Sequence, residues 1–98
     1  YITMSETYVA TPGLQIVGFI SLIEEYLAAI FVRPEFQAMG IGSSLLTHAK
    51  SHRNTLQLKV FNKNRKSVNF YLSKGFAIVS ESKDEATGEN EFIMQWYR

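Results

Sequence analysis

The sequence predicts a mixed α/β fold in which two helices pack on a mixed sheet, in the order β-β-β-α-β-α-β-β. Two observations point to this order. Apolar runs of strand length occur at residues 15–23, 26–32 and 55–61, and apolar residues recur at helical spacing between residues 41 and 52. With 98 residues, 46% of them hydrophobic, the chain fits a single domain over residues 1–98.

The first three predicted strands are neighbours joined by short turns. Residues 7–10 (TYVA) and 15–23 (QIVGFISLI) make a hairpin around Thr11-Pro12-Gly13, because Pro and Gly occupy positions that favour a turn. Glu24-Glu25 forms the next turn. Residues 26–32 (YLAAIFV) are nearly all apolar, which is typical of a central strand covered on both faces.

Two helices follow from apolar spacing and from capping residues. The first runs from Ile41 to about His52, and its buried stripe is formed by Ile41, Leu45, Leu46 and Ala49. Residues 55–61 (TLQLKVF) form a strand between the helices. Asn64 suits the N-cap of the second helix and Gly75 suits its C-terminal cap. The buried side of this helix is expected to hold Val68, Tyr71 and Leu72.

A β-hairpin ends the chain. The segments FAIVSES (76–82) and EFIMQWY (91–97) have strand composition, and a polar turn at residues 86–90 separates them.

Composition excludes several classes of function. Ten Lys and Arg against nine Asp and Glu give a net charge of +1, which argues against a nucleic-acid partner. The chain has no cysteine, so disulfides, thiolate metal sites and a cysteine nucleophile are excluded. The absence of cysteine is compatible with a location in the reducing cytoplasm. The longest apolar stretch, around residues 16–23, is too short to span a bilayer, so no membrane partner is expected. His48 and His52 lack an obvious third ligand, so we expect an exposed helix face rather than a metal site.

Gly40 and Gly42 stand at the start of the first helix, after a strand that must end before Pro34. A helix N-terminus attracts anions because its first N–H groups have no intrahelical partners and carry a partial positive charge. Glycines remove Cβ atoms that would block a phosphate, at a cost of about 1 kcal/mol of helix propensity each. The alternative is that they only permit a tight turn. A P-loop and a dinucleotide fingerprint fit worse, because no Lys follows Gly42 and Leu45 replaces a third glycine.

Two segments carry a family resemblance. VRP (32–34) is followed by QAMGIG (37–42), and the second helix reads NRKSVNFYLSKGF (64–76). The first resembles the Q/R-x-x-G-x-G/A signature of the GNAT superfamily of N-acetyltransferases, and the second resembles its N-x-x-[AS]-x-x-F-Y-x-x-x-G-F helix. The resemblance runs from about residue 7 to the end and is closest to small bacterial members. It implies an acyl-coenzyme A N-acyltransferase-like fold and an acetyltransferase that uses acetyl-CoA as co-substrate and no metal.

The resemblance also implies where the coenzyme binds. In the family, the strands matching residues 26–32 and 56–61 splay apart, and the pantetheine arm lies in the gap. The backbone contacts expected for the pantetheine and the acetyl group come from Ile30, Phe31 and Val32. The pyrophosphate is expected to accept hydrogen bonds from the N–H groups of Gln37, Ala38, Met39, Gly40, Ile41, Gly42 and Ser43. Asn64 is expected to contact the coenzyme arm while it caps its own helix.

The implied chemistry is direct transfer of the acetyl group to a primary amine, because no acetyl-cysteine relay can form without cysteine. Tyr71, at the family's F-Y position, is expected to give a proton to the departing thiolate; the alternative is an amphipathic core residue. Glu25, together with Glu24, is a candidate base for the acceptor amine, and both could equally be turn residues that face solvent. Alternatively, the Phe31 side chain could line the channel through which the acceptor amine enters. The acceptor is a protein lysine, a protein N-terminus or a small-molecule amine.

Two other functions fit the sequence. A degenerate domain could hold coenzyme A as a non-catalytic sensor, and a small α/β interaction module could use its glycines only to make a turn. Family members usually have a strand and two helices before the first hairpin, whereas this sequence begins at Tyr1. We therefore expect an incomplete chain, and an apolar sheet face left uncovered would predict self-association as a homodimer.

Overall fold

In the computed structural model, residues 5–11 and 15–98 are described. The chain divides into two compact units, the N-terminal unit (residues 1–54) and the C-terminal unit (residues 55–98). The predicted order of strands and helices is confirmed, with one short 3-10 helix added. Pro12 and Gly13 of the first predicted turn lie outside the described residues. Within residues 5–11 and 15–98, no helix is long and apolar enough to cross a membrane.

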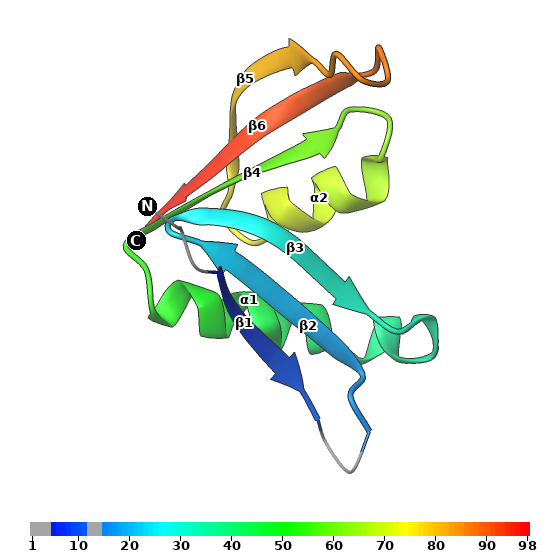
Figure 1. The fold of residues 1–98 in the computed structure, drawn as a ribbon, viewed down its shortest axis with the longest axis vertical. Coiled ribbons are helices and arrows are strands. Elements are labelled where there is room, and N and C mark those ends of the chain that lie inside the picture. The colour runs from blue at the N-terminus through cyan, green and yellow to red at the C-terminus, as the bar shows by residue number, and fades with distance from the viewer. Residues whose placement is uncertain (1–4, 12–14) are drawn as a thin grey trace. The chain divides into compact units, whose positions relative to one another are not determined.

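Three antiparallel strands form the sheet of the N-terminal unit (Figure 1): β1 (Ser5–Ala10), β2 (Gly18–Ile23) and β3 (Tyr26–Val32). Strand β1 begins at an earlier residue than the sequence predicts, and β2 begins at a later one. Pairing nevertheless continues before β2, because the Val17 N–H donates to the Ala10 carbonyl at 2.9 Å. The turn at Glu24-Glu25 lies where it is predicted.

Helix α1 (Ile41–Ser51) packs on one face of this sheet, because its apolar stripe meets the alternate residues of the strands. The buried residues at this contact are Leu45, Leu46 and Ala49 of the helix and Ile20, Leu22 and Leu27 of the strands. Phe31 is 48% exposed, and its ring centroid lies 6.0 Å from that of Phe19. Ala28 and Ala29 are also exposed, so the prediction that β3 is covered on both faces is wrong. An apolar strand composition does not by itself establish that a second face is covered, because apolar atoms make up much of any protein surface.

A 3-10 helix, η1 (Pro34–Met39), connects β3 to α1, and apolar spacing does not predict it. Pro34 occupies its start, where a missing N–H group costs nothing. The Phe36 N–H donates to the Arg33 carbonyl at 2.9 Å and closes the first turn. Six residues are too few to show a helical apolar period, so only Pro34 signals this element.

The C-terminal unit is an antiparallel sheet in the order β4–β6–β5, with helix α2 packed on β4 (Figure 1). Its elements are β4 (Thr55–Phe61), α2 (Arg65–Ser73), β5 (Ala77–Lys83) and β6 (Asn90–Tyr97). The buried core holds Leu56, Leu58, Val60, Val68, Tyr71, Phe76 and Met94. Leu72 is 43% exposed, so its predicted burial is wrong. Val68 and Tyr71 define the buried stripe, and Leu72 lies at its margin, about 100° around the helix from Tyr71 and about 40° from Val68.

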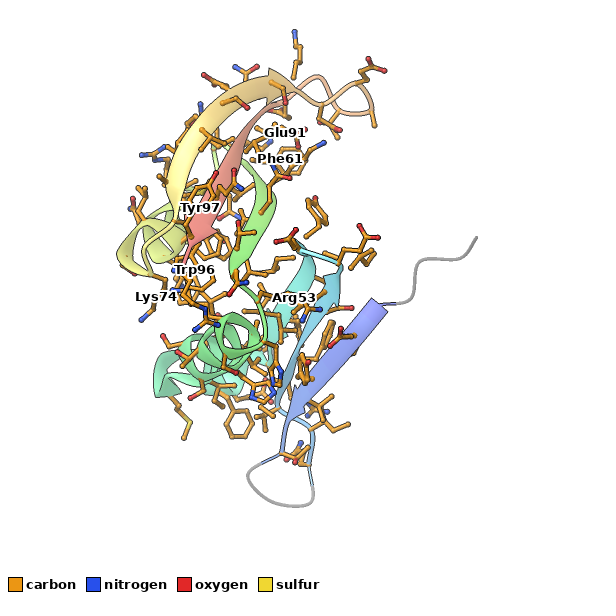
Figure 2. All side chains as sticks on the ribbon, turned by 90° about the vertical axis from the view of Figure 1, so that its left-hand side faces the viewer. Arg53, Phe61, Lys74, Glu91, Trp96 and Tyr97 are labelled. Atoms are coloured by element: carbon orange, nitrogen blue, oxygen red, sulfur yellow. The ribbon has the colours of Figure 1, made fainter. Side chains whose placement is uncertain are left out.

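Helix α2 ends in a cap built by Gly75, as the sequence predicts. Gly75 has a φ of +90°, and the Phe76 N–H reaches back to the Tyr71 carbonyl at 3.1 Å. A Cβ atom at Gly75 would lie 3.4 Å from Cδ1 of Trp96, so the ring packs closely over the cap. Figure 2 shows Trp96 beside Lys74 at this end of the helix.

Arg53 joins three parts of the N-terminal unit just after α1 (Figure 2). Its Nη2 lies 2.8 Å from Oε1 of Glu6, and its Nε donates to the Glu24 carbonyl at 2.7 Å. The Tyr8 hydroxyl donates to Oε2 of Glu6 at 2.7 Å. The hydrogen bonds from Tyr8 and from Arg53 lower the pKa of Glu6, and the bond from Tyr8 has the larger effect.

We expect the Glu6→Gln variant to lose less stability in acid than the wild type does. The pKa of Glu6 in the folded protein lies below its ordinary value of 4.5, so the ionised carboxylate stabilises the fold above pH 4.5. This stabilisation is lost as the pH falls through the lower, folded-state pKa. Melting temperatures between about pH 3 and pH 7 measure the effect, with Glu85→Gln, at an exposed turn, as the control. Equal pH slopes for the wild type and Glu6→Gln would contradict it.

Candidate functional site

The connection between β3 and α1 brings the predicted phosphate-binding residues together. Val32 ends β3, Gln37 lies in η1, and Gly40 has left-handed φ and ψ angles of 77° and 10°. Helix α1 begins at the next residue, Ile41. The predicted residues from Gln37 to Ser43 therefore form one continuous stretch of 3-10 helix, turn and helix start.

The structure gives the two glycines different roles. Gly40 needs its positive φ, which residues with a Cβ atom adopt only at a cost, and a Cβ atom there would meet nothing within 4 Å. Gly42 is the second residue of α1, where no positive φ is needed and where glycine is about 1 kcal/mol less favourable than alanine. The tight-turn alternative therefore explains Gly40 and leaves Gly42 unexplained.

The N-terminus of α1 offers a set of backbone donors. The first hydrogen bond of the helix runs from the Ser44 N–H to the Gly40 carbonyl at 3.0 Å. The N–H groups of Ile41, Gly42 and Ser43 precede this bond and lie at the positive end of the helix dipole. The first turn of α1 carries no acidic residue that would repel an anion. The geometry is therefore suited to a phosphate group.

The side chain of Gln37 has a role that sequence reasoning missed. Its Nε2 donates to the carbonyl of Val32 at 3.1 Å, so the side chain folds back from η1 onto the end of β3. The sequence carries no signal for this bond, because the path of the backbone between the two residues decides whether they meet. The other two predicted contacts on β3, Ile30 and Phe31, pair with Ile20 and Phe19 of β2.

Helix α2 carries two predicted site residues in the C-terminal unit. The Asn64 Oδ1 accepts a hydrogen bond from the Ser67 N–H at 3.4 Å, and the Asn64 carbonyl accepts one from the Val68 N–H at 3.0 Å. The predicted N-cap is therefore confirmed. Tyr71 follows two turns later, so the two residues lie about 10 Å apart along the helix axis.

Tyr71 is buried in an aromatic environment. It is 7% exposed, and its ring centroid lies 5.4 Å from that of Phe70 and 5.6 Å from that of Phe76. Burial raises the pKa of Tyr71 above its ordinary value of 10.0, because the ionised phenolate would lose its hydration. The phenol is therefore neutral and carries its proton at pH 7. Such a phenol suits a proton donor, and its burial equally suits the alternative of an amphipathic core residue.

Glu25 is exposed in the turn between β2 and β3. A strand rises about 3.3 Å per residue, so Glu25 and Val32 lie about 20 Å apart at opposite ends of β3. The structure therefore does not bring Glu25 close to the connection that holds residues 37–43. The neighbouring Glu24 has a φ of 54°, and its carbonyl accepts the hydrogen bond from Arg53, which is a structural role.

His48 in α1 and His52 at the C-cap of this helix are both exposed, as the sequence predicts. Tyr8 packs against both, with ring centroids 4.4 Å from His48 and 5.5 Å from His52. In the part of the chain that the structure describes, no group of three or more His, Cys, Asp or Glu side chains could hold a metal ion.

Comparison with known sequences identifies similar proteins. Residues 2–97 match the family model described as the acetyltransferase (GNAT) domain. The chain is 33% identical over 97 residues to the peptidyl-lysine N-acetyltransferase YiaC of Escherichia coli (strain K12). This similarity covers 98% of the chain and 66% of the relative, so the chain spans slightly less than two thirds of the relative's length.

Comparison with solved structures gives the same fold. The solution structure of apo-form YjaB from Escherichia coli is 28% identical, with a TM-score of 0.76, over 84% of this chain and 57% of that one. A GNAT family acetyltransferase from Elizabethkingia anophelis, solved with acetyl-CoA bound, has a TM-score of 0.83 at 21% identity, over 96% of this chain and 76% of that one. This likeness confirms the predicted mixed α/β fold.

Proposed function

The chain belongs to the family of acetyltransferase (GNAT) domains, and from this premise we propose that it binds acetyl-CoA and transfers the acetyl group directly to a primary amine. One observation carries the proposal: Gly42 stands in the first turn of α1, where the backbone has no need of glycine. A side chain larger than a methyl group at this position would crowd the N–H groups of residues 41–43. A glycine there leaves room for a diphosphate to approach these donors.

We infer that the acceptor is the side-chain amine of a peptide lysine. The relative YiaC is named a peptidyl-lysine N-acetyltransferase, and its similarity extends over 98% of this chain. A lysine ammonium has no lone pair until it loses its proton, so the reaction needs a base. Glu25 is the candidate for this role, directly or through a water molecule, since it is exposed and carries a carboxylate.

We propose roles for the remaining residues as follows. Backbone groups of Ile30, Phe31 and Val32 align the pantetheine arm, while the N–H groups of residues 37–43 hold the diphosphate. Acetyl-CoA supplies the thioester, from which the amine nitrogen takes the acetyl group as the carbon–sulfur bond breaks. Tyr71 donates its phenolic proton to the departing sulfur and later regains one from solvent. Asn64 contacts the coenzyme arm with the part of its side chain that the cap leaves free.

Calorimetric titration with acetyl-CoA, combined with an acetylation assay on a lysine-containing peptide, tests this function. We expect saturable binding and release of free coenzyme A thiol that depends on the peptide. Binding without turnover on the peptide or on small amines would favour the non-catalytic sensor. No binding at all would favour a structural module, in which the glycines only shape a turn.

A further inference from the structure

The hydrogen bond from the Gln37 side chain links η1, in the connection between β3 and α1, back to the last residue of β3. The Gln37 Nε2 and the Val32 carbonyl lie 3.1 Å apart, although five residues separate them along the chain. Gln37 is exposed, so core packing does not hold this side chain in place. The bond is the reason why the carboxamide points at the strand end.

The connection needs such support because its regular structure is weak. Runs of 3-10 helix longer than three or four residues are uncommon, since their hydrogen bonds have poor geometry, and η1 has six residues. Its start is held by the Arg33 N–H, which donates to the Val17 carbonyl at 2.7 Å. Its end is held where the Gly40 carbonyl accepts the first hydrogen bond of α1. The Gln37 bond supports the middle of η1.

We propose that Gln37 is a positioning residue, whose carboxamide fixes the backbone N–H groups that receive the diphosphate of acetyl-CoA. The inference rests on the proposed function of the same site. The carboxamide acts on the protein backbone and makes no contact with the anion. Without the bond, the N–H groups from Met39 to Gly42 must be ordered when the ligand binds, which weakens binding. The acetyl-transfer step itself does not involve Gln37.

The test replaces Gln37 with methionine, which has a similar length and no donor. We expect the Kd and the KM for acetyl-CoA to rise together by about fivefold, roughly the effect of one exposed hydrogen bond, with kcat unchanged. S-acetylpantetheine lacks the diphosphate, so its kcat/KM should be the same for the variant and the wild type. Gln15→Met is the matched control, because Gln15 is also exposed in the N-terminal unit and should show no change. Gln37→Glu keeps the shape and removes the donor, so it should bind acetyl-CoA at least as weakly as Gln37→Met.

The outcomes separate this inference from the function on which it rests. Wild-type affinity for acetyl-CoA in both Gln37 variants would overturn the positioning role alone. An equal loss with S-acetylpantetheine, or a fall in kcat at constant KM, would also overturn it, because the effect would not act through the diphosphate. Failure of the wild type to bind acetyl-CoA would overturn the proposed function and this inference together.

Discussion

Gly42→Val should weaken the binding of acetyl-CoA by at least about 100-fold and leave the free protein folded. The valine side chain would stand among the N–H groups of residues 41–43 and keep the diphosphate away from them. Two lost hydrogen bonds to a charged group, each of about 1.5 kcal/mol or more, account for this factor. Valine is a better helix former than glycine, so the helix itself should not be weakened. Calorimetry gives the Kd, and the melting temperature reports the fold.

Two further variants show whether the effect belongs to this position. Gly42→Ala should raise the stability of the free protein by about 0.5–1 kcal/mol and keep most of the binding, because the G/A position of the signature accepts a methyl group. Ser44→Ala is the matched control, since Ser44 is exposed in the same helix and its N–H is already bonded. A folded Gly42→Val protein that binds acetyl-CoA like the wild type would eliminate the proposed diphosphate site.

The glycine pair shows how far the sequence predicts the site. Its position at a helix start follows from the sequence, because Pro34 ends the strand and the apolar period of α1 begins at Ile41. The sequence does not show which glycine serves the turn, because backbone angles depend on the whole connection. The structure shows that Gly40 has the positive φ, so the turn does not account for Gly42. Gly40→Asn should therefore keep more binding than Gly40→Val, since asparagine tolerates a positive φ.

In the rest of the fold, too, some features follow from the local sequence and others depend on the path of the whole chain. The bounds of α1 and of β3 and β4 follow from the sequence, because the apolar period and the flanking turn residues set each of them. The exposure of one face of β3 could not be predicted from the sequence, because it depends on which elements pack on that face and not on the composition of the strand. The Gln37 side chain and the Arg53 contacts depend on the path of the chain and could not be predicted either.

Tyr71→Phe should lower kcat by about 10² to 10⁴-fold, the usual contribution of a general acid, with little change in the Kd for acetyl-CoA. The departing thiolate has an ordinary pKa of about 8.5 and benefits from a proton at neutral pH. Phenylalanine keeps the contacts with Phe70 and Phe76 and removes only the hydroxyl group, so the core should stay packed. Steady-state kinetics with a lysine peptide, alongside calorimetry, separate the two quantities.

The pH dependence gives an independent check on the buried phenol. Its pKa in the folded protein lies above 10.0, so Tyr71 remains a competent donor up to that pH and should cause no loss of rate below it. In the unfolded chain the phenol ionises near pH 10. Stabilisation from the neutral, buried phenol is therefore complete below about pH 10 and is lost as the pH rises through the folded-state pKa. Tyr71→Phe should resist alkaline unfolding better than the wild type does.

Tyr97→Phe separates the role of Tyr71 from a general effect of removing a hydroxyl group. Tyr97 is 67% exposed at the end of β6 (Figure 2), so this variant should keep the wild-type kcat. An unchanged kcat in Tyr71→Phe would leave Tyr71 as a core residue and nothing more. A raised Kd with unchanged kcat would instead make it a binding residue. Only a fall in kcat at constant Kd, absent from the Tyr97 control, supports proton donation by Tyr71.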